Sequence, residues 1–354
     1  MIRLAVVEKA YIEITSACNL RCKHCYNNSS VLNNQIDKDD FYRIVQELVE
    51  CGCAEISISG GEPFMHNHII DYIRACIILG IKRINIVTNG TLISQKILEE
   101  ILKIDTQSLV VFQLSIEGSC SKEHDFIRGE GCFNAVKRAV ELLQKNNIRF
   151  HIHSMLHKGN KFGIEKTIEN AATWGAEQIT FSFFKNQGRY KANKDTIELT
   201  IEEKINILKR MEKFLPKGFV LFEPPFYGYC PLSTIEQDIY QGKAEYSIKI
   251  DPATNVYFCQ MFDGEKGGLG SLYEKGLQEI IDDKQIIEFA KRVYSELTGS
   301  EKCVSCAINK LCYMGCPAME FCNNNFTSDS EECKLRLANM LKLLGVIQKM
   351  ERNN

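Results

Sequence analysis

Short apolar runs rich in β-branched residues alternate with amphipathic stretches along the first two thirds of the chain. The runs are predicted strands, and they occupy residues 11–15, 55–59, 83–88, 109–116, 149–156 and 178–184. Between them apolar side chains recur at helical spacing, as Phe41 and Ile44 do behind a predicted helix cap at Asp37. Helices that regularly follow strands predict a parallel sheet with right-handed crossovers.

Six such repeats without a dinucleotide-binding fingerprint favour an α/β fold, a partial or closed TIM-like (β/α)6 barrel. In barrels of this kind the chemistry lies at the carboxyl ends of the strands. The alternation stops after the helix-like residues 201–214, at Pro216 and Gly218. We therefore expect one domain over residues 1–222 and a second, smaller domain over residues 223–354.

The second predicted domain is rich in cysteine and glycine and has little apolar core of its own. A hairpin is predicted from residues 247–250 and 256–258, and metal ligation is expected to help the segment fold. The end of the chain has the pattern of an amphipathic helix, which we expect to dock against the barrel. Its apolar positions are Leu335, Leu337, Met340, Leu341, Leu343 and Leu344.

Composition and charge narrow the class of protein. The 354 residues include 43 Lys and Arg against 45 Asp and Glu, a formal net charge of -2. This balance gives no field that would attract nucleic acid or an anionic membrane, so neither is an expected partner. No signal-peptide pattern is present, and no apolar run reaches the ~18 residues of a membrane span. We expect a cytoplasmic protein.

Sixteen cysteines are many for a cytoplasmic protein, where disulfides rarely persist, so clustered cysteines are interpreted first as metal ligands. One group stands near the N-terminus, and a second group occupies the last third of the chain. The scattered cysteines are predicted to pack as small apolar core residues. These are Cys51, Cys53, Cys76, Cys120 and Cys132.

The first group has the spacing Cys18-x3-Cys22-x2-Cys25 and directly follows the first predicted strand. Three thiolates from one short loop can hold three corners of a four-iron cluster and leave the fourth iron without a protein ligand. A zinc knot is the alternative, but zinc loops favour CxxC pairs and a closed fourth ligand. The loop also falls at the carboxyl end of its strand, where a barrel places its chemistry.

A glycine-rich turn follows the second predicted strand. It reads Gly60-Gly61-Glu62-Pro63. The two glycines allow the backbone to approach a ligand closely and to present carbonyl groups to an ammonium group. Taken alone, the same residues would also suit an ordinary turn between a strand and a helix.

Polar side chains follow the fourth and sixth predicted strands. Ser115 and Glu117 end the fourth strand, and a simple turn carboxylate is the alternative interpretation of Glu117. Arg128 comes soon afterwards and could clamp a carboxylate bidentately, or lie on the surface of its loop. Arg189 belongs to a basic stretch behind the sixth strand, which we predict to be a solvated loop.

The second group is most specific at Cys303-x2-Cys306-x5-Cys312-x3-Cys316, which Cys333 follows. Such spacing indicates metal ligation. Two CxxC-like pairs could also close a tetrahedral zinc site, so the residues alone leave zinc as an alternative.

Together, the motifs resemble those of radical S-adenosylmethionine (radical SAM) enzymes, from residue 11 to about residue 346. The loop from Cys18 to Cys25 resembles the signature of that family. This implies a [4Fe–4S] cluster whose open iron binds the amino and carboxylate groups of SAM. The turn from Gly60 to Pro63 is similar to the family motif that contacts the SAM amino group.

The same resemblance suggests further SAM contacts. Ser115 is a candidate for the carboxylate or ribose of SAM, and Glu117 and Arg128 are candidate cofactor-binding residues beside it. Related sequences often carry Asp where Glu117 stands, so this chain departs from the family pattern at that position.

The second cysteine group resembles the SPASM domain of this family, which carries auxiliary iron–sulfur clusters. The resemblance implies two auxiliary [4Fe–4S] clusters. One would be held by Cys303, Cys306, Cys312 and Cys333, and the other by Cys230, Cys259 and Cys316.

This chain departs from the SPASM pattern in three places. Thr254 occupies the hairpin position where glycine is usual, and the gap from Cys230 to Cys259 is longer than typical. Glu236 stands where a further cysteine is expected a few residues beyond Cys230. The last iron of that cluster would therefore be open, bound by a carboxylate, or reached by Cys322.

The resemblance implies an oxidoreductase that splits SAM reductively into methionine and a 5′-deoxyadenosyl radical, which takes a hydrogen atom from an inert carbon. The expected substrate is a ribosomally made peptide or a protein, modified by a thioether or carbon–carbon cross-link or by epimerisation. Expected partners are an electron donor such as flavodoxin or ferredoxin and, unless the barrel surface recognises the peptide, a separate leader-recognition protein.

Other functions remain open at this point. Anaerobic sulfatase-maturing enzymes are similar, but such relatives place Asp directly after the hairpin cysteine, where this chain has Gln260. Tetrapyrrole side-chain chemistry is another alternative, and a cluster-carrying or zinc-binding scaffold is the alternative outside enzymes. The sequence does not identify the substrate or the carbon that loses hydrogen.

Overall fold

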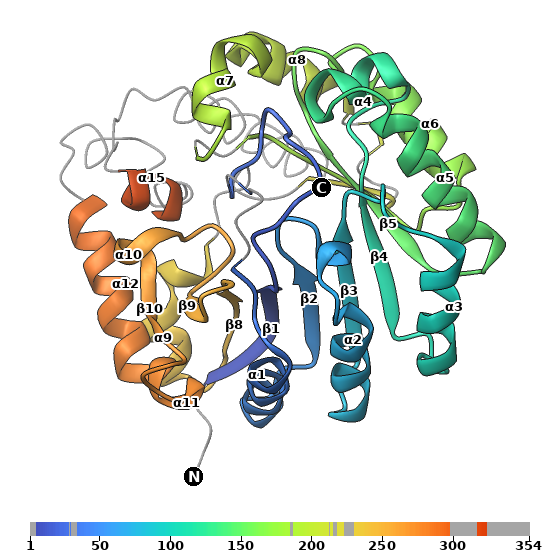
Figure 1. The fold of residues 1–354 in the computed structure, drawn as a ribbon. Helices are drawn as coiled ribbons and strands as arrows, with labels where there is room; N and C mark the ends of the chain where they lie inside the picture. The colour runs from blue at the N-terminus through green and yellow to red at the C-terminus, as the bar shows by residue number, and fades with distance from the viewer. Residues whose placement is uncertain are drawn as a thin grey trace, which may run out of the picture.

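The computed structural model describes residues 5–27, 29, 34–184, 187–211, 213–214, 218–222, 230–297 and 317–323. Within them one ten-stranded sheet runs in the order β10-β9-β8-β1-β2-β3-β4-β5-β6-β7 (Figure 1). The strands are β1 (Ala5–Glu13), β2 (Glu55–Ser59), β3 (Arg83–Thr88), β4 (Val110–Ser115), β5 (Phe150–Met155), β6 (Ile179–Ser182), β7 (Val220–Phe222), β8 (Ala244–Ile250), β9 (Asn255–Tyr257) and β10 (Gly268–Ser271).

Strands β1 to β7 pair in chain order and in parallel, and helices connect them along the outer side of the sheet (Figure 1). This confirms the predicted α/β fold with a partial barrel. The connecting helices are α1 (Lys38–Glu50), α2 (Ile69–Ile78), α3 (Gln95–Ile104), α4 (Ser121–Arg128), α5 (Cys132–Lys145), α6 (Ile164–Thr173), α7 (Tyr190–Ile197) and α8 (Ile201–Met211), with a short 3-10 helix η1 (Pro63–Met65) after β2. The Asp37 side chain caps α1, as predicted, by accepting from the N–H of Asp40 at 2.8 Å.

The two faces of the strands differ in chemistry, and this difference places the site. Successive side chains of a strand point to opposite faces. In β4, Phe112 and Leu114 are fully buried in the apolar core, whereas Gln113 and Ser115 line an internal cavity. In β2, Ser57 faces the same cavity between buried isoleucines. The barrel therefore has an apolar outer layer and a polar interior.

The sheet continues across the predicted domain boundary. β8 pairs in parallel with β1, from Ala5 opposite Ala244 to Ile12 opposite Ile250, on the side of β1 away from β2. The predicted hairpin is confirmed, because β8 and β9 pair antiparallel. Thr254 lies in its turn with φ 61°, the left-handed conformation that the expected glycine would adopt most readily. The boundary at residue 222 stays a prediction.

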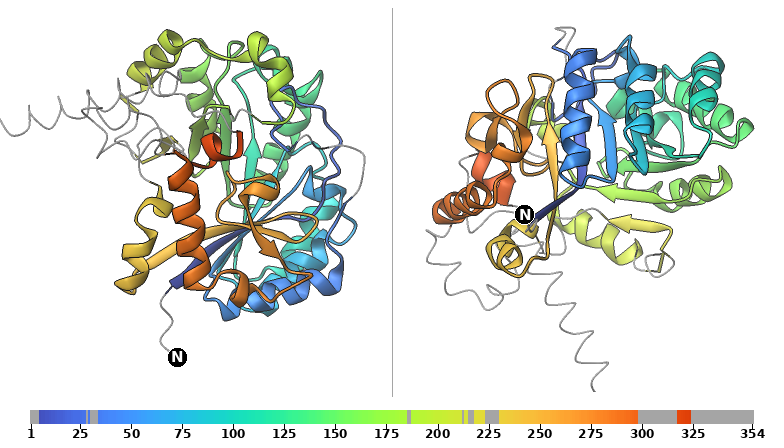
Figure 2. Two further views of the ribbon diagram at one scale, coloured as in Figure 1. Left: turned by 90° about the vertical axis from the view of Figure 1, so that its left-hand side faces the viewer. Right: turned by 90° about the horizontal axis from the view of Figure 1, so that it is seen from below.

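The part of the chain after β7 packs its helices beside β8 and β10 (Figure 2). Its helices are α9 (Ile235–Tyr240), α10 (Gly264–Gly267), α11 (Leu277–Ile280), α12 (Asp283–Leu297) and α15 (Pro317–Asn323), and a 3-10 helix η3 (Pro231–Ser233) precedes α9. The predicted C-terminal helix lies outside the described residues. No helix within the described residues is long and apolar enough to cross a membrane.

The scattered cysteines largely follow the prediction. Cys51, Cys53, Cys76 and Cys132 are buried, but Cys120 is exposed, and for it the prediction is wrong. Cys120 occupies the N-cap position of α4, where the chain turns into the helix at the surface.

Candidate active site

Cys18, Cys22 and Cys25 line one cavity of ≈ 130 Å³ beyond the end of β1. Cys18 and Cys22 are buried, and Cys25 is half-buried. The N–H of Leu20 donates to Cys18 Sγ at 3.4 Å, and Arg128 Nη1 lies 3.7 Å from Cys22 Sγ. Two of the sulfur atoms thus face a donor, but burial outweighs these donors and raises the pKa of Cys18, to about 11, and of Cys22.

Gly60 and Gly61 pack directly against the start of the cysteine loop. The N–H of Gly61 donates to Thr15 O at 2.7 Å. A Cβ at Gly60, where φ is 140°, would meet Thr15 O at 2.3 Å, and a Cβ at Gly61 would meet Ala17 O at 2.2 Å. The close approach predicted for these glycines is therefore made, within the protein itself, to the backbone of the cysteine loop.

Gly61→Ala is expected to destabilise the chain by roughly 1–3 kcal/mol, because the added methyl group overpacks a backbone contact, and to reduce iron uptake by displacing Cys18. Gly175→Ala is the matched control. It has φ 72° and open space around the added Cβ, so it costs roughly 1–2 kcal/mol of backbone strain, far from the cysteines. Urea unfolding and iron content measure both effects. Equal iron uptake by the two variants would contradict this interpretation.

Glu62 connects the end of β2 to the end of β3. Its fully buried carboxylate accepts from Thr88 Oγ1 at 2.7 Å and from the N–H of Asn89 at 2.8 Å. The N–H of Phe64 also donates to it at 3.2 Å. Burial raises the pKa of Glu62 to about 6. Pro63 is buried behind it and begins η1. Glu62 therefore holds the glycine turn in place through protein contacts.

Glu117 and Arg128 form a buried ion pair beside the cysteine loop. Arg128 donates to Glu117 Oε1 from Nε at 2.9 Å and from Nη2 at 2.5 Å, while the N–H of Met155 donates to Oε2 at 2.5 Å. Burial alone would raise the pKa of Glu117, but Arg128, His24, His124 and the N–H of Met155 together outweigh burial and bring this pKa to about 2. Both carboxylate oxygens are thus engaged by protein donors, and Arg128 also points to Cys22. The predicted roles of both residues in binding SAM stay predictions.

Arg189 clamps the cysteine loop from the opposite side of the barrel. It donates from Nε to Cys22 O at 3.1 Å and from Nη1 to Ser29 O at 2.7 Å. Its N–H donates to Cys25 O at 2.9 Å. At Gly188 a Cβ would meet Cys25 O at 2.3 Å. The prediction of a solvated loop is therefore wrong for Arg189, and the glycine directly before it was the signal of a close approach.

His24, between the second and third cysteines, is largely buried, with 10% of its side chain exposed, and it carries one buried atom without a partner. Its Nδ1 has no hydrogen-bond partner among the described residues, and Nε2 lies 3.9 Å from Glu117 Oε1. Burial lowers the pKa of His24 to about 3, so the ring is neutral. A buried polar atom without a partner is costly, and this one borders the cavity that the cysteines line. A bound group that reaches Nδ1 would satisfy it.

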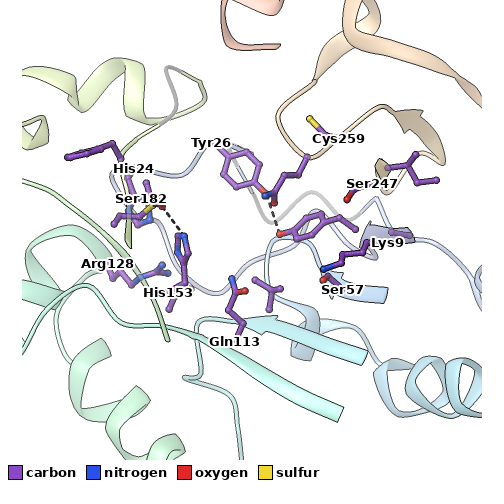
Figure 3. Close-up of a pocket in the computed structure, with 18 residues that line it drawn as sticks. Lys9, His24, Tyr26, Ser57, Gln113, Arg128, His153, Ser182, Ser247 and Cys259 are labelled. Carbon is purple, nitrogen blue, oxygen red and sulfur yellow. Dashed lines mark hydrogen bonds between the residues drawn. The ribbon is translucent and has the colours of Figure 1, made fainter. Parts of the chain in front are cut away.

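A larger cavity of ≈ 390 Å³ fills the barrel interior and adjoins the first. Tyr11, Tyr26, Ser115 and Arg128 line both cavities. Figure 3 shows Arg128 and His153 on one side of the larger cavity and Cys259 on the other. The two adjoining cavities therefore lie between the cysteine loop and Cys259, the cysteine that follows the β8–β9 hairpin. Its lining otherwise carries mainly hydroxyl, amide and apolar groups.

The donor set fits a cluster better than a single ion. No three His, Cys, Asp or Glu side chains within the described ranges converge closely enough to hold one metal ion. A tetrahedral zinc site would require such convergence. In a four-iron cluster each thiolate binds a different iron, so the three sulfurs stand apart. The three thiols that line one cavity and the unsatisfied His24 Nδ1 fit an iron–sulfur cluster with a bound cofactor.

The predicted auxiliary ligands are only partly described. Cys230 and Cys259 are half-buried and pack at the edge of the main core, near η3 and β9. The remaining predicted ligands lie outside the described residues, and their assignment stays a prediction. They are Cys303, Cys306, Cys312, Cys316 and Cys333.

Residues 12–171 match the model of the radical SAM superfamily. This segment is a radical SAM domain. Proteins of this superfamily use SAM and a [4Fe–4S] cluster. The matched segment contains the cysteine loop, the glycine turn and the Glu117–Arg128 pair.

Two curated relatives extend the comparison. The AdoMet-dependent heme synthase of Methanosarcina barkeri is 30% identical over 57% of this chain and 57% of that protein. The antilisterial bacteriocin subtilosin biosynthesis protein AlbA of Bacillus subtilis is 25% identical over 77% of this chain and 59% of that protein. The chain thus spans less than two thirds of the length of either relative.

Among solved structures, native anSMEcpe with bound AdoMet superposes with a TM-score of 0.70 at 19% identity, covering 98% of this chain and 100% of that chain. Another structure of that protein contains AdoMet and a Kp18Cys peptide. At this identity the likeness supports the fold, and it covers the parts of the chain before and after the radical SAM domain as well.

Proposed function

We propose that this chain is an enzyme that cleaves SAM reductively and uses the resulting radical to modify a peptide or protein oxidatively. The observation that carries the proposal is the pair of adjoining cavities, one lined by Cys18, Cys22 and Cys25 and the other by Cys259. A substrate residue held there would have the proposed radical source on one side and the proposed auxiliary ligand on the other.

In this proposal Cys18, Cys22 and Cys25 hold the [4Fe–4S] cluster, and SAM occupies the adjoining cavity beside His24 and Ser115. When bound, cluster and SAM supply a 5′-deoxyadenosyl radical, formed by one-electron cleavage of SAM. The protein itself holds the cluster-binding loop in a fixed position. Its contacts fix the cysteine loop from several sides, and the buried setting limits the access of water to the radical.

The contacts that would fix the loop come from the segments that follow three strands, β2, β4 and β6. Glu62 holds the glycine turn against the loop, Arg128 lies beside Cys22, and Arg189 holds the loop backbone. A reacting carbon must lie close to the radical for hydrogen transfer, and a rigid support keeps that geometry constant. The predicted direct contacts of Gly60, Gly61, Glu62, Pro63, Ser115, Glu117 and Arg128 with SAM remain part of the proposal.

We further propose the two auxiliary [4Fe–4S] clusters and the domain division at residue 222 as predicted from the sequence. The position of Cys259 at the larger cavity supports the nearer cluster. Bound there, a cluster could accept the electron that an oxidised peptide carbon releases. Flavodoxin or ferredoxin is the proposed electron donor, a separate leader-recognition protein is a proposed partner, and the cytoplasm, where thiols stay reduced, is the proposed compartment.

A ribosomally made peptide is our preferred substrate. The match to AlbA, whose name describes bacteriocin biosynthesis, covers more of this chain than the match to the heme synthase, 77% against 57%. The fold neighbour anSMEcpe supports a peptide substrate, since one of its structures contains AdoMet together with a Kp18Cys peptide. Gln260, which lines the larger cavity, cannot act as a carboxylate base, and this disfavours the sulfatase-maturing alternative.

The product distinguishes these substrates. Reconstituted protein, SAM, a strong reductant and a candidate peptide are expected to give a peptide that is lighter by two hydrogen atoms if a cross-link forms. Epimerisation would instead add deuterium from heavy water without net loss. Mass spectrometry reads both, with Cys22→Ala as the control. Formylglycine in a sulfatase peptide, or a modified tetrapyrrole with unmodified peptides, would contradict the preferred substrate.

A further inference from the structure

We propose that Cys322 supplies the missing thiolate of the auxiliary cluster that Cys230 and Cys259 would help to hold. The inference rests on the auxiliary cluster of the proposed function and adds a ligand that lies outside the SPASM pattern. It decides among the three possibilities that the sequence left open for the last iron, namely an open position, a carboxylate, or Cys322.

Glu236, the carboxylate at the expected ligand position, is engaged elsewhere. Its Oε1 accepts from Lys291 Nζ at 2.8 Å, and the side chain is 42% exposed. Helix α9, which carries Glu236, packs against α12, which carries Lys291. The carboxylate therefore faces solvent on the outer side of these helices, while a ligand of a buried cluster must face inward.

Cys322 is brought to the Cys259 loop by its neighbour Phe321. Phe321 is 1% exposed, and its ring lies 6.3 Å from that of Phe262 and 6.4 Å from that of Phe289. These contacts anchor the short helix α15 against α12 and the segment after β9. Cys322 Sγ consequently lies close to the backbone at Gly267. A Cβ added to Gly267 would lie 3.0 Å from this sulfur.

Cys259 and Cys322 flank one loop that directs amides at both sulfurs. The N–H of Met261 donates to Cys259 Sγ at 3.4 Å, and a backbone hydrogen bond from Asp263 reaches Cys322. The same type of contact occurs at Cys18, where the N–H of Leu20 lies 3.4 Å from Sγ. Hydrogen bonds to the sulfurs are among the features that tune iron–sulfur clusters.

A buried cation lies in the same region. Lys249, on β8, is 1% exposed, and its Nζ lies 3.4 Å from Asp263 Oδ1. Lys249 and Cys259 both lie near enough to Cys322 to interact with it electrostatically. A buried positive charge is costly unless a negative group compensates it. Lys249 already faces the half-exposed Asp263, the buried Glu13 and the Tyr257 ring at 4.3 Å. A cluster ligated by several thiolates would add further negative charge beside it.

The test uses the full-length chain with Cys18, Cys22 and Cys25 all replaced by alanine, so that only auxiliary clusters are measured. This background is expected to bind about eight irons per chain after anaerobic reconstitution. Adding Cys322→Ala is expected to lower the iron content toward about four per chain, or to convert one cluster to a three-iron form that electron paramagnetic resonance (EPR) detects. Cys322→Ser, which can still offer an oxygen ligand, should retain more iron but shift the EPR spectrum.

Two controls accompany these variants. Cys120→Ser removes an exposed thiol far from the loop, and Glu236→Gln removes the alternative carboxylate; neither is expected to change iron content or EPR spectrum. Unchanged iron and spectra in both Cys322 variants, loss of iron in Glu236→Gln, or a Cys259–Cys322 disulfide in reconstituted protein would each overturn the assignment. If the variant without Cys18, Cys22 and Cys25 binds no iron, both the Cys322 assignment and the auxiliary clusters are overturned. SAM cleavage by the wild type tests the radical chemistry separately.

Discussion

Replacing Cys22 with alanine is expected to remove about four irons per chain and to abolish the release of 5′-deoxyadenosine from SAM. The reason is geometric. Cys22 is 7% exposed and stands between the other two thiols of its loop, where Arg128 faces its sulfur at 3.7 Å and Arg189 holds its backbone carbonyl. Among the described residues, no other cysteine lines the cavity that these three share. No other described thiol could therefore replace Cys22 as a ligand.

Cys120→Ser serves as the matched control for that variant, because it removes a thiol that is exposed and lies outside the cavity. It is expected to retain iron and SAM cleavage at the wild-type level. Iron analysis and liquid chromatography of the nucleoside product provide the two readouts. Full 5′-deoxyadenosine release by the Cys22 variant would exclude the loop as the cluster site.

Replacing Arg128 with leucine is expected to destabilise the chain by about 3–5 kcal/mol, because it leaves the Glu117 carboxylate buried without its partner. Glu117 is fully buried, so solvent cannot compensate for the loss. In the wild type the pKa of Glu117 is lowered to about 2. The ionised Glu117 therefore contributes fully to stability at pH values above the usual carboxyl pKa of 4.5. This contribution is lost as the pH falls toward 2.

The matched control for this pair is Arg149→Leu. Arg149 and Glu177 form the same kind of ion pair, at 2.6 Å, but both side chains are at least 40% exposed, so the expected cost is at most about 1 kcal/mol. Urea unfolding at neutral pH compares the two variants. The double variant Arg128→Met with Glu117→Leu should recover much of the loss, since no charge is left buried. Equal losses for Arg128→Leu and Arg149→Leu would contradict the importance of the buried pair.

Local patterns predicted the repeated units of the fold because each strand and helix carries its own periodicity. They did not predict the pairing of β8 with β1, since 239 positions separate the paired Ala5 and Ala244 and no local period reports such a partner. The first strand also begins earlier than its apolar run, at Ala5, where this pairing supports it. Long-range pairing thus extended the barrel sheet into the predicted second domain.

The candidate site was predictable to the extent that its residues are close in sequence. The cysteine spacing and the glycine turn are local motifs, and both lie at the strand ends where they were expected. What was not predictable is which groups they contact. The glycines approach the cysteine loop, Glu117 pairs with Arg128, and Arg189 clamps the loop from 164 positions beyond Cys25. These contacts arise from folding, so the sequence motifs could not distinguish support of the loop from contact with a ligand.

The most direct test of the central claim is the release of 5′-deoxyadenosine by the wild-type chain. The protein is reconstituted anaerobically with iron and sulfide, its iron content is determined, and it is then incubated with SAM and a strong reductant. Our account predicts 5′-deoxyadenosine and methionine in equal amounts, both absent without reductant. No 5′-deoxyadenosine from a chain that carries its full complement of about twelve irons would contradict it.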